Sequence, residues 1–274
     1  MQDNSFNAAL VQMPVCADRK QNVKKAVEMI SRAASDGAQM IVLPEMFSCL
    51  YENRSFVENA EEAGGETWQA MAESAAKNGV YLVAGSFPEK AGGKLYNSSF
   101  VFGPDGNQLA FHRKAHLFDI NVPGGQVFKE SYTFTAGDKA TVFETPWGIA
   151  GLCICFDMRF SELATAMALA GAKLIVVPAA FNMTTGPAHW ETMFRQRAVD
   201  NQVYTIGVAP ARDCGGPYVS YGHSIVCSPW GRIEYQADFD ECIGIVKIDP
   251  AEVEKIRSQL PILSSRNPEL YSIR

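Results

Sequence analysis

Residues 37–47 read GAQMIVLPEMF, and residues 171–181 repeat the pattern as GAKLIVVPAAF. Each copy has an apolar run that ends at a proline, which predicts a buried β-strand followed by a turn. Two further pairs of segments repeat in the same order, so the sequence predicts a chain built from two similar halves. The further pairs are VYLVAGSF (80–87) with VYTIGVAP (203–210), and FVFGPDGNQL (100–109) with IVCSPWGRIE (225–234).

Strand-like and helix-like segments alternate along the chain, which predicts an α/β fold. Together with the repeat, they predict a four-layer α-β-β-α sandwich: two related sheets stacked face to face, with helices outside. We expect one domain over residues 1–274, with the tail at about 259–274 as an extension for oligomer contacts. GPDG (103–106) and SPWG (228–231) are expected hairpin turns. The expected strands are 8–12, 39–44, 80–86, 97–102, 148–154, 173–178, 203–209, 223–227 and 243–248, and the expected helices are 20–36, 66–78, 159–171, 187–201 and 250–258.

The composition is that of an ordinary globular protein, since 47% of the 274 residues are hydrophobic and 20% are charged. The formal net charge is −6 and no basic block occurs, which argues against binding to nucleic acid. No apolar run reaches the roughly 18 residues of a membrane span, and the first residues lack a secretory pattern. The seven cysteines are odd in number and scattered, so we expect reduced thiols and a cytoplasmic protein.

The repeat also isolates one acidic residue. Glu45 follows the proline of the first copy, whereas Ala179 stands at the same place in the second. The turn therefore forms without a carboxylate. Glu45 is therefore a candidate catalytic residue, and the alternative is that it is an ordinary carboxylate in a turn.

Two cysteines lie close together in GLCICFDMRF, at residues 151–160. Cys155 is expected where a strand ends and a helix is about to begin, and backbone N–H groups and the helix dipole there favour a thiolate. Cys153 is expected inside the strand as inert core. The alternatives are a buried, unreactive Cys155, or a metal or redox site that uses both thiols.

A nucleophilic cysteine needs a base, and amide chemistry also needs a group that stabilises an oxyanion. None of the four histidines lies in a protease-like signature, so Glu45 is the other candidate base. Lys114 ends the strand that begins in NQLAFH, and its ammonium would stabilise an oxyanion if it pointed into the site. Glu130 lies in a long irregular connection, where functional sites often occur. A solvated lysine and a solvated loop acid are the alternatives.

These segments resemble the three motifs of the nitrilase superfamily of carbon–nitrogen hydrolases. LPEMF (43–47), HRKAHLF (112–118) and GLCICFDMRFSEL (151–163) follow in the order of that family, and the resemblance extends along the whole chain. It implies an α-β-β-α sandwich, no metal or organic cofactor, and homodimers. MTTGPAHWE (183–191) and HLFDINVPG (116–124) resemble the omega-amidase branch of the family. That branch hydrolyses the terminal amide of small omega-amido 2-oxo acids, namely 2-oxoglutaramate and 2-oxosuccinamate.

The resemblance also implies roles for particular residues. Glu45 would be the general base, Lys114 the oxyanion stabiliser and Cys155 the nucleophile, with a thioester intermediate. Glu130 matches a second family glutamate that holds the lysine and orients the substrate. The backbone N–H of Phe156 is the expected second oxyanion donor.

The residues that bind the substrate are predicted from position alone. Arg159 is the arginine nearest in sequence to the nucleophile and is the expected partner of a free carboxylate, with a structural role at the helix start as the alternative. Phe181 and Thr185 follow the strand that repeats the Glu45 strand, so we expect them to line the pocket.

Three other functions stay open at this point. A related amidase could act on deaminated glutathione or on an N-carbamoyl amine instead. An inactive scaffold is the non-enzymatic alternative, although it predicts loss of at least one of the four catalytic positions and all four are present. A redox or metal-binding protein would use Cys153 and Cys155.

Overall fold

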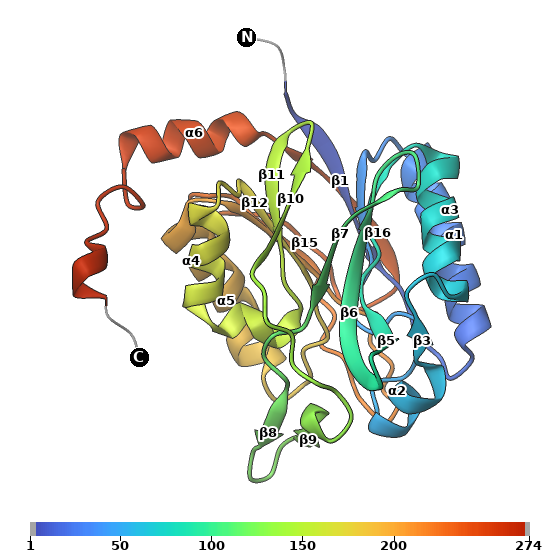
Figure 1. Ribbon diagram of the computed structural model, residues 1–274. Helices are drawn as coiled ribbons and strands as arrows, with labels where there is room; N and C mark the ends of the chain where they lie inside the picture. Colours follow the sequence, from blue (N-terminus) through green and yellow to red (C-terminus); the bar gives the residue numbers. More distant parts are fainter. Residues whose placement is uncertain (1–3, 272–274) are drawn as a thin grey trace.

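Two large β-sheets pack face to face in the computed structural model, which describes residues 4–271 (Figure 1). The first sheet has eight strands and the second has six. The first sheet runs in the order β16 (Cys242–Ile248), β1 (Phe6–Gln12), β2 (Met40–Val42), β4 (Tyr81–Val83), β6 (Lys94–Phe102), β5 (Phe87–Ala91) and β3 (Glu61–Glu62), and β7 (Gln108–Arg113) also pairs with β6. The second runs in the order β10 (Thr141–Thr145), β11 (Gly148–Leu152), β12 (Leu174–Pro178), β13 (Tyr204–Val208), β14 (Ile225–Cys227) and β15 (Ile233–Gln236).

Apolar side chains fill the space between the two sheets. Leu10 and Val42 of the first sheet belong to the same buried cluster as Leu152, Val176 and Ile206 of the second. Successive side chains of a strand point to opposite faces, so the alternate apolar residues of each strand pack against the outer helices instead. Both faces of the central strands are therefore buried, which explains why their sequences are apolar throughout rather than alternating.

Helices cover the outer face of each sheet, and the predicted α-β-β-α layers are confirmed (Figure 1). Helices α1 (Arg19–Ser35) and α3 (Glu66–Asn78) cover the first sheet, whereas α4 (Ser161–Leu169) and α5 (Gly186–Asn201) cover the second. Helix α1 begins where the Asp18 carboxylate accepts hydrogen bonds from two backbone N–H groups of the first turn. Two further helices, α2 (Asn53–Asn59) and α6 (Pro250–Gln259), lie outside these layers.

The predicted repeat is present in the strand topology. In the first sheet β1, β2 and β4 are parallel neighbours, and β6 and β7 then continue the sheet in antiparallel pairs. The second sheet has the same arrangement in β11, β12 and β13, followed by β14 and β15. The two expected hairpin turns join β6 to β7 and β14 to β15. The equivalent ends of β2 and β12 therefore occupy related places in the two sheets.

Some predicted boundaries were wrong at the segment that carries the cysteines. The strand β11 ends at Leu152 rather than at residue 154, and a short 3-10 helix at Cys155–Arg159 precedes α4. Cys155 is therefore the first residue of a short 3-10 helix. The dipole of this short helix is weaker than that of the α-helix that we expected to begin next to Cys155.

The connection that holds Glu130 is more regular than expected. A hairpin of β8 (Asp119–Asn121) and β9 (Val127–Lys129) precedes it, and Glu130–Tyr132 forms a 3-10 helix. These two strands are mostly exposed and have only three residues each, which is too short for the run of about 4–8 residues that predicts a strand from sequence. The solvated loop acid expected as an alternative is wrong, because Glu130 is fully buried.

The chain beyond α6 lies along the outside of the molecule (Figure 1). It includes a 3-10 helix at Pro268–Leu270, and the expected tail continues past the described residues to 274. Across residues 4–271, none of the helices combines the length and the apolar character that crossing a membrane requires.

A close approach of two strand ends fixes the turn that carries Glu45. Gly85, just after β4, has a φ of +51°, and a Cβ there would lie 2.1 Å from the carbonyl oxygen of Pro44. The next residue, Ser86, donates its N–H to the same carbonyl and accepts the N–H of Met46 with its hydroxyl. A glycine is required at this position on both conformational and steric grounds.

We expect Gly85→Ala to lower the free energy of unfolding by about 1–3 kcal/mol, because the added methyl group overpacks the turn and strains a left-handed backbone. Urea denaturation followed by circular dichroism measures the change. Gly215→Ala is the matched control, because its Cβ would meet only the Asp213 carboxylate at 3.4 Å. The control should stay within about 0.5 kcal/mol of the unaltered protein. Equal stability of the two variants would contradict the tight fit at Gly85.

Candidate active site

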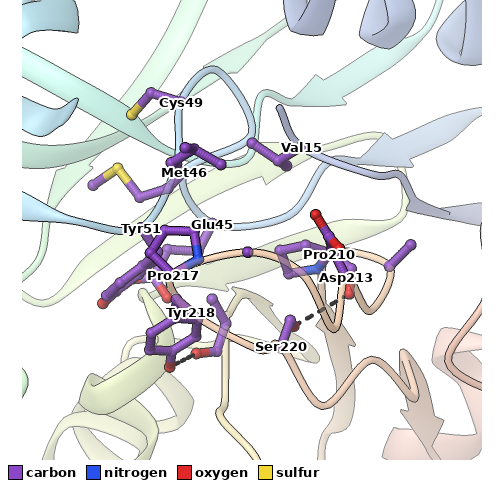
Figure 2. Close-up of a pocket in the computed structure, with 14 residues that line it drawn as sticks. Val15, Glu45, Met46, Cys49, Tyr51, Pro210, Asp213, Pro217, Tyr218 and Ser220 are labelled. Carbon is purple, nitrogen blue, oxygen red and sulfur yellow. Dashed lines mark hydrogen bonds between the residues drawn. The ribbon is translucent and has the colours of Figure 1, made fainter. Parts of the chain in front are cut away.

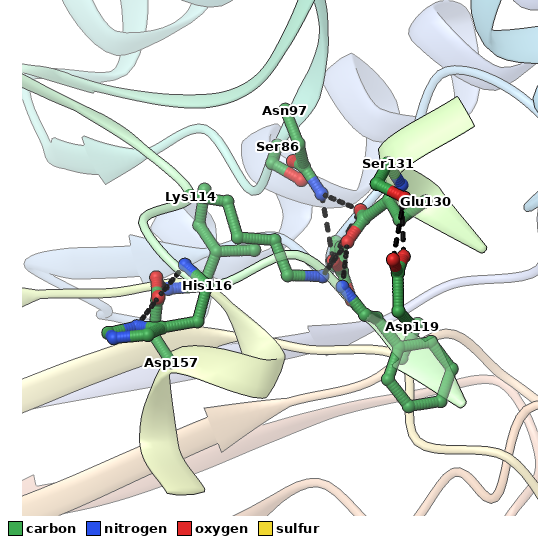
Figure 3. Close-up of polar contacts among 12 residues, drawn as sticks. Ser86, Asn97, Lys114, His116, Asp119, Glu130, Ser131 and Asp157 are labelled. Atoms are coloured by element: carbon green, nitrogen blue, oxygen red, sulfur yellow. Dashed lines mark hydrogen bonds and ion pairs between the residues drawn. The ribbon is translucent and has the colours of Figure 1, made fainter. Parts of the chain in front are cut away.

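A fully buried ammonium lies between two fully buried carboxylates (Figure 3). Lys114 follows β7, and its Nζ lies 2.8 Å from Glu45 Oε1 and 2.9 Å from Glu130 Oε2. Glu45 comes from the turn after β2, and Glu130 begins the 3-10 helix after β9. The structure therefore brings together three of the predicted site residues that lie far apart in sequence.

Two neutral groups, a side-chain amide and a backbone N–H, donate further hydrogen bonds to this cluster. The Asn97 amide donates to Glu45 Oε1 at 2.9 Å and to Glu130 Oε1 at 3.0 Å, so it bridges the two carboxylates. The backbone N–H of Phe118 donates to Glu130 Oε2 at 2.6 Å. Glu130 is thus held by donors on both oxygens, whereas Glu45 Oε2 has no hydrogen-bond partner among the described residues. That oxygen is available to accept a proton.

Two stacked tyrosines line a small cavity next to Glu45 (Figure 2). The rings of Tyr51 and Tyr218 lie 4.5 Å apart, and the Tyr51 hydroxyl donates to Glu45 Oε1 at 3.4 Å. The Tyr218 hydroxyl donates to the carbonyl of Ala180. Burial raises the pKa of both tyrosines well above its usual value, so both are neutral hydrogen-bond donors here.

Cys155 lies at the sharp turn that follows β11. Its side chain is 4% exposed and its φ is +46°, in a region that residues other than glycine seldom adopt. The thiol interacts electrostatically with Glu45 and Lys114, and the backbone N–H of Ala180 also contacts the sulfur. Backbone strain of this kind is held by the surrounding structure and occurs preferentially at functional sites.

The charges of the cluster decide the protonation of each group. Burial raises the pKa of Cys155 well above 9.0, and the Glu45 carboxylate raises it further while Lys114 opposes this shift. Burial alone would lower the pKa of Lys114, but the carboxylates of Glu130 and Glu45 raise it above its usual value. Burial also raises the pKa of Glu45. The site therefore combines a neutral thiol, a permanent ammonium and a carboxylate of increased basicity.

The guanidinium of Arg159 lies between the faces of two phenylalanines. It is 5.5 Å from the Phe156 ring centroid and 5.1 Å from that of Phe181, and Nη1 is 3.2 Å from His189 Nδ1. Burial lowers the pKa of Arg159, and the Cys155 sulfur is among the groups that act on it. Among the ion pairs between described residues, none involves Arg159.

Thr185 occupies a different kind of position. It lies at the start of α5, its hydroxyl donates to Asn182 Oδ1 at 3.2 Å, and its backbone N–H donates to the same oxygen at 2.9 Å. Neither Thr185 nor Phe181 lines the cavity beside Glu45. The observed contacts of Thr185 are those of a residue that shapes the turn before α5.

Sequence reasoning missed several residues of the site. Asn97, Tyr51 and Tyr218 were not predicted, because an asparagine inside a strand and two tyrosines in loops have no local signal. Asp157 was also missed, although it lies two residues after Cys155 and is fully buried. A charged residue directly after the apolar GLCICF segment was the available signal.

The two neighbouring thiols have different surroundings. Both belong to the apolar cluster under α4 and α5, and burial raises the pKa of each. The charged groups that act on Cys155 are Glu45 and Lys114, whereas those that act on Cys153 are Asp157 and Arg197. The described cysteines are all free thiols. Among residues 4–271, no three cysteine, histidine or acidic side chains are grouped as a metal ion would require.

The sequence matches the family model for carbon-nitrogen hydrolase over residues 7–258. The chain belongs to the carbon–nitrogen hydrolase family.

Particular relatives share nearly the whole length of the chain. Omega-amidase NIT2 of Danio rerio is 47% identical over 270 residues, which is 98% of each chain. Omega-amidase NIT2 of Homo sapiens is 46% identical over 269 residues, again 98% of each. Among solved structures, Saccharomyces cerevisiae Nit3, described as a member of branch 10 of the nitrilase superfamily, is 36% identical with a TM-score of 0.88 over 96% of each chain. The C. elegans NitFhit protein is 32% identical with a TM-score of 0.90, over 99% of this chain and 67% of that one.

We expect the rate of alkylation of Cys155 by iodoacetamide to rise with pH and to show no plateau below pH 9.0, because burial raises the pKa of this thiol well above that value. The neutral form dominates at lower pH, so the reactive thiolate becomes populated only as the pH increases. Peptide mapping by mass spectrometry follows Cys155 separately from the exposed Cys16 and Cys214. A plateau reached below pH 9.0 would show that the thiol is ionised at rest.

Proposed function

We propose that this protein is a cysteine-dependent omega-amidase that hydrolyses the terminal amide of 2-oxoglutaramate and 2-oxosuccinamate to the dicarboxylate and ammonia. Two observations support this proposal. The relatives that match the whole chain at 46–47% identity are omega-amidases. The buried group of Glu45, Lys114 and Cys155 contains a base, a cation and a nucleophile, which are the parts that amide hydrolysis needs.

In the first half of the proposed reaction, Glu45 takes the proton of the Cys155 thiol and the sulfur attacks the amide carbon. The carbonyl electron pair moves to oxygen, where the Lys114 ammonium and the Phe156 N–H stabilise the negative charge. The carbon–nitrogen bond then breaks as Glu45 returns the proton to nitrogen. Ammonia leaves, and the acyl group remains on sulfur as a thioester. The unpaired Oε2 of Glu45 supports its role as the proton carrier.

In the second half, Glu45 takes a proton from water and the resulting hydroxide attacks the thioester. The carbon–sulfur bond breaks, the acid leaves, and the sulfur regains the proton from Glu45. The proposed reaction needs only side chains, backbone and water, so no metal or organic cofactor takes part.

Glu130 would act through Lys114 rather than on the substrate. Its two oxygens lie 3.2 and 2.9 Å from Nζ and keep the ammonium charged and in place. Phe118 N–H and Asn97 in turn hold the Glu130 carboxylate. An oxyanion donor that is already fixed needs no reorganisation during the reaction, which is the main source of its catalytic effect.

Arg159 is the proposed partner of the distal carboxylate of the substrate. A partly buried cation without an ion pair to any residue in 4–271 favours an anionic ligand, and its aromatic neighbours hold the guanidinium plane. Phe181 packs under the same guanidinium and would hold it toward the substrate rather than line the cavity beside Glu45. Thr185 would act indirectly, by holding the loop that follows Phe181.

We further propose that the protein is a single catalytic domain that forms a cytoplasmic homodimer. The family match spans 252 of the 274 residues, counted from 7 to 258, which supports one domain. Exposed apolar side chains on α4, α5 and the C-terminal tail support a contact between copies: Leu169 is 53% exposed, Val199 39% and Leu270 74%. The free thiols support a reducing compartment.

Ammonia release from purified protein tests the substrate. We expect 2-oxoglutaramate and 2-oxosuccinamate to be hydrolysed with a kcat/KM at least about tenfold above that for deaminated glutathione or an N-carbamoyl amine, a difference of about 1.4 kcal/mol. The reverse order would identify one of those related amidases instead. No hydrolysis of any compound would favour the scaffold.

The two neighbouring cysteines give a matched test of the nucleophile. Cys155→Ala should abolish turnover, because no other group forms the thioester, whereas Cys153→Ala should keep most of the activity and lose some stability. Intact-mass spectrometry should find the acyl adduct on Cys155. An adduct on Cys153 would overturn the assignment.

We expect Arg159→Ala to lower kcat/KM for 2-oxoglutaramate about 10- to 100-fold, mainly through KM, because a charged hydrogen bond to the distal carboxylate contributes about 1.5–3 kcal/mol. Hydrolysis of an uncharged amide that lacks this carboxylate should change little. Arg257→Ala is the matched control, because Arg257 is also half-buried but donates to the carbonyls of Ala172 and Asn201. An equal loss on both amides would show that Arg159 has a structural role only.

A further inference from the structure

The carboxylate of Asp157 joins the two segments that carry Cys155 and Lys114 (Figure 3). Asp157 lies in the 3-10 helix that begins at Cys155, and its side chain is fully buried. Its Oδ2 accepts the backbone N–H of Ile154, the residue before the thiol, at 3.1 Å. Asp157 therefore closes the turn from which Cys155 projects.

The same carboxylate reaches the segment after β7. The backbone N–H groups of Ala115 and His116 donate to Oδ1 at 3.1 and 2.8 Å, directly after Lys114. The Nδ1 of His116 lies 2.7 Å from Oδ1, and the Nε2 of His112 lies 2.9 Å from Oδ2. Among the described residues, the hydrogen bonds between residues 112–118 and 153–157 all end on this one carboxylate.

These five donors make a buried carboxylate acceptable in an apolar region. Burial alone would raise the pKa of Asp157, but hydrogen bonds from His112 and His116 lower it well below its usual value. A side chain with fewer acceptor sites than a carboxylate would leave some of these backbone N–H groups buried without partners, which would lower the stability of the fold. The turn also keeps Cys155 at a φ of +46°, a conformation that the surrounding structure must hold.

The opposite side of the cluster is held separately. Glu45 and Glu130 fix the end of the Lys114 side chain, and the Glu45 carboxylate also contacts the Cys155 thiol directly. Among the described residues, however, neither acid has a hydrogen bond to the backbone of the Cys155 turn. The distance from ammonium to sulfur therefore depends on how the two backbone segments are joined as well as on the Glu45 side chain between them.

We propose that Asp157 is a positioning residue that fixes the Cys155 thiol relative to the Lys114 ammonium. His112 and His116 take part in this role by holding the Asp157 carboxylate. The effect on turnover rests on the proposed function, but the effect on the thiol does not. Asp157 touches neither the reacting atoms nor the cavity beside Glu45, so it acts through the two residues it aligns.

Asp157→Asn tests the proposal, because it keeps the shape and replaces one acceptor oxygen by an NH₂ group that faces N–H donors. We expect kcat and the alkylation rate of Cys155 to fall about 100-fold, since displacement of a reacting group by about 1 Å has an effect of this size. KM should change far less, because Arg159 rather than Asp157 is the proposed contact of the substrate.

Glu89→Gln is the matched control. Glu89 is also a buried carboxylate, 3% exposed, and it binds Arg113, the residue before Lys114, at 2.7 and 2.8 Å. It has no contact with the Cys155 turn among the hydrogen bonds of the described residues. We expect this variant to lose stability but to keep a nearly normal alkylation rate of Cys155. That result would show that slower alkylation in Asp157→Asn comes from a displaced thiol rather than from a less stable fold. Equal slowing of alkylation in both variants would overturn the proposal.

His116 provides a second test if Asp157→Asn does not fold. Its side chain is 33% exposed, so substitutions there should be tolerated. His116→Ala removes one charged hydrogen bond and should slow alkylation about tenfold, whereas His116→Asn places an amide near Nδ1 and should restore most of the rate. An unchanged rate in His116→Ala, or equal rates in both variants, would overturn the proposal.

The readouts separate this proposal from the proposed function. If the unaltered protein fails to hydrolyse 2-oxoglutaramate while these variants still slow alkylation, the substrate is wrong and the positioning role stands. If the unaltered protein hydrolyses 2-oxoglutaramate, and the Asp157→Asn variant has the same kcat and the same alkylation rate as the unaltered protein, the positioning role is wrong.

Discussion

The site depends on one buried ammonium held between two buried carboxylates. Removing three charges from water is expensive, and the attraction between them compensates only when the geometry is good and the remaining oxygens have donors. Asn97, Tyr51 and the Phe118 N–H supply those donors around Lys114. Each donor comes from a different part of the chain. The charges can therefore be buried only when the fold brings these segments together around Lys114.

This arrangement also explains why the thiol is neutral at rest. Burial disfavours a thiolate at Cys155, and the Glu45 carboxylate disfavours it further, while the Lys114 ammonium offsets only part of this effect. The nucleophile must then be generated by proton transfer at the moment of attack, and Glu45 has both the basicity and the free oxygen to receive the proton. A preformed thiolate, as the helix-dipole argument suggested, is therefore not how this site is arranged.

The fold could be predicted from sequence because the repeat at 37–47 and 171–181 shows its symmetry directly. Comparison of the two copies also showed a glutamate, Glu45, where the second copy has Ala179. In the structure Glu45 lies beside Lys114 and Cys155. What sequence could not predict were contacts made across the fold. Asn97 reads as an ordinary strand residue, and Asp157 gains its partners from a segment 41 or more residues earlier. The strands of the exposed β8–β9 hairpin have only three residues each, too few for a recognisable pattern, so the burial of Glu130 after it was also missed.

The two related strand ends contribute unequally to the pocket. The end of β2 supplies the Glu45 side chain, whereas the end of β12 has alanines, of which Ala180 contacts the sulfur through its backbone N–H. The acid and the lysine come from the first sheet and its connections, and the thiol comes from the second. Neither half would carry the chemistry as a separate fragment. Enzymatic turnover would accordingly report whether the two sheets have docked correctly.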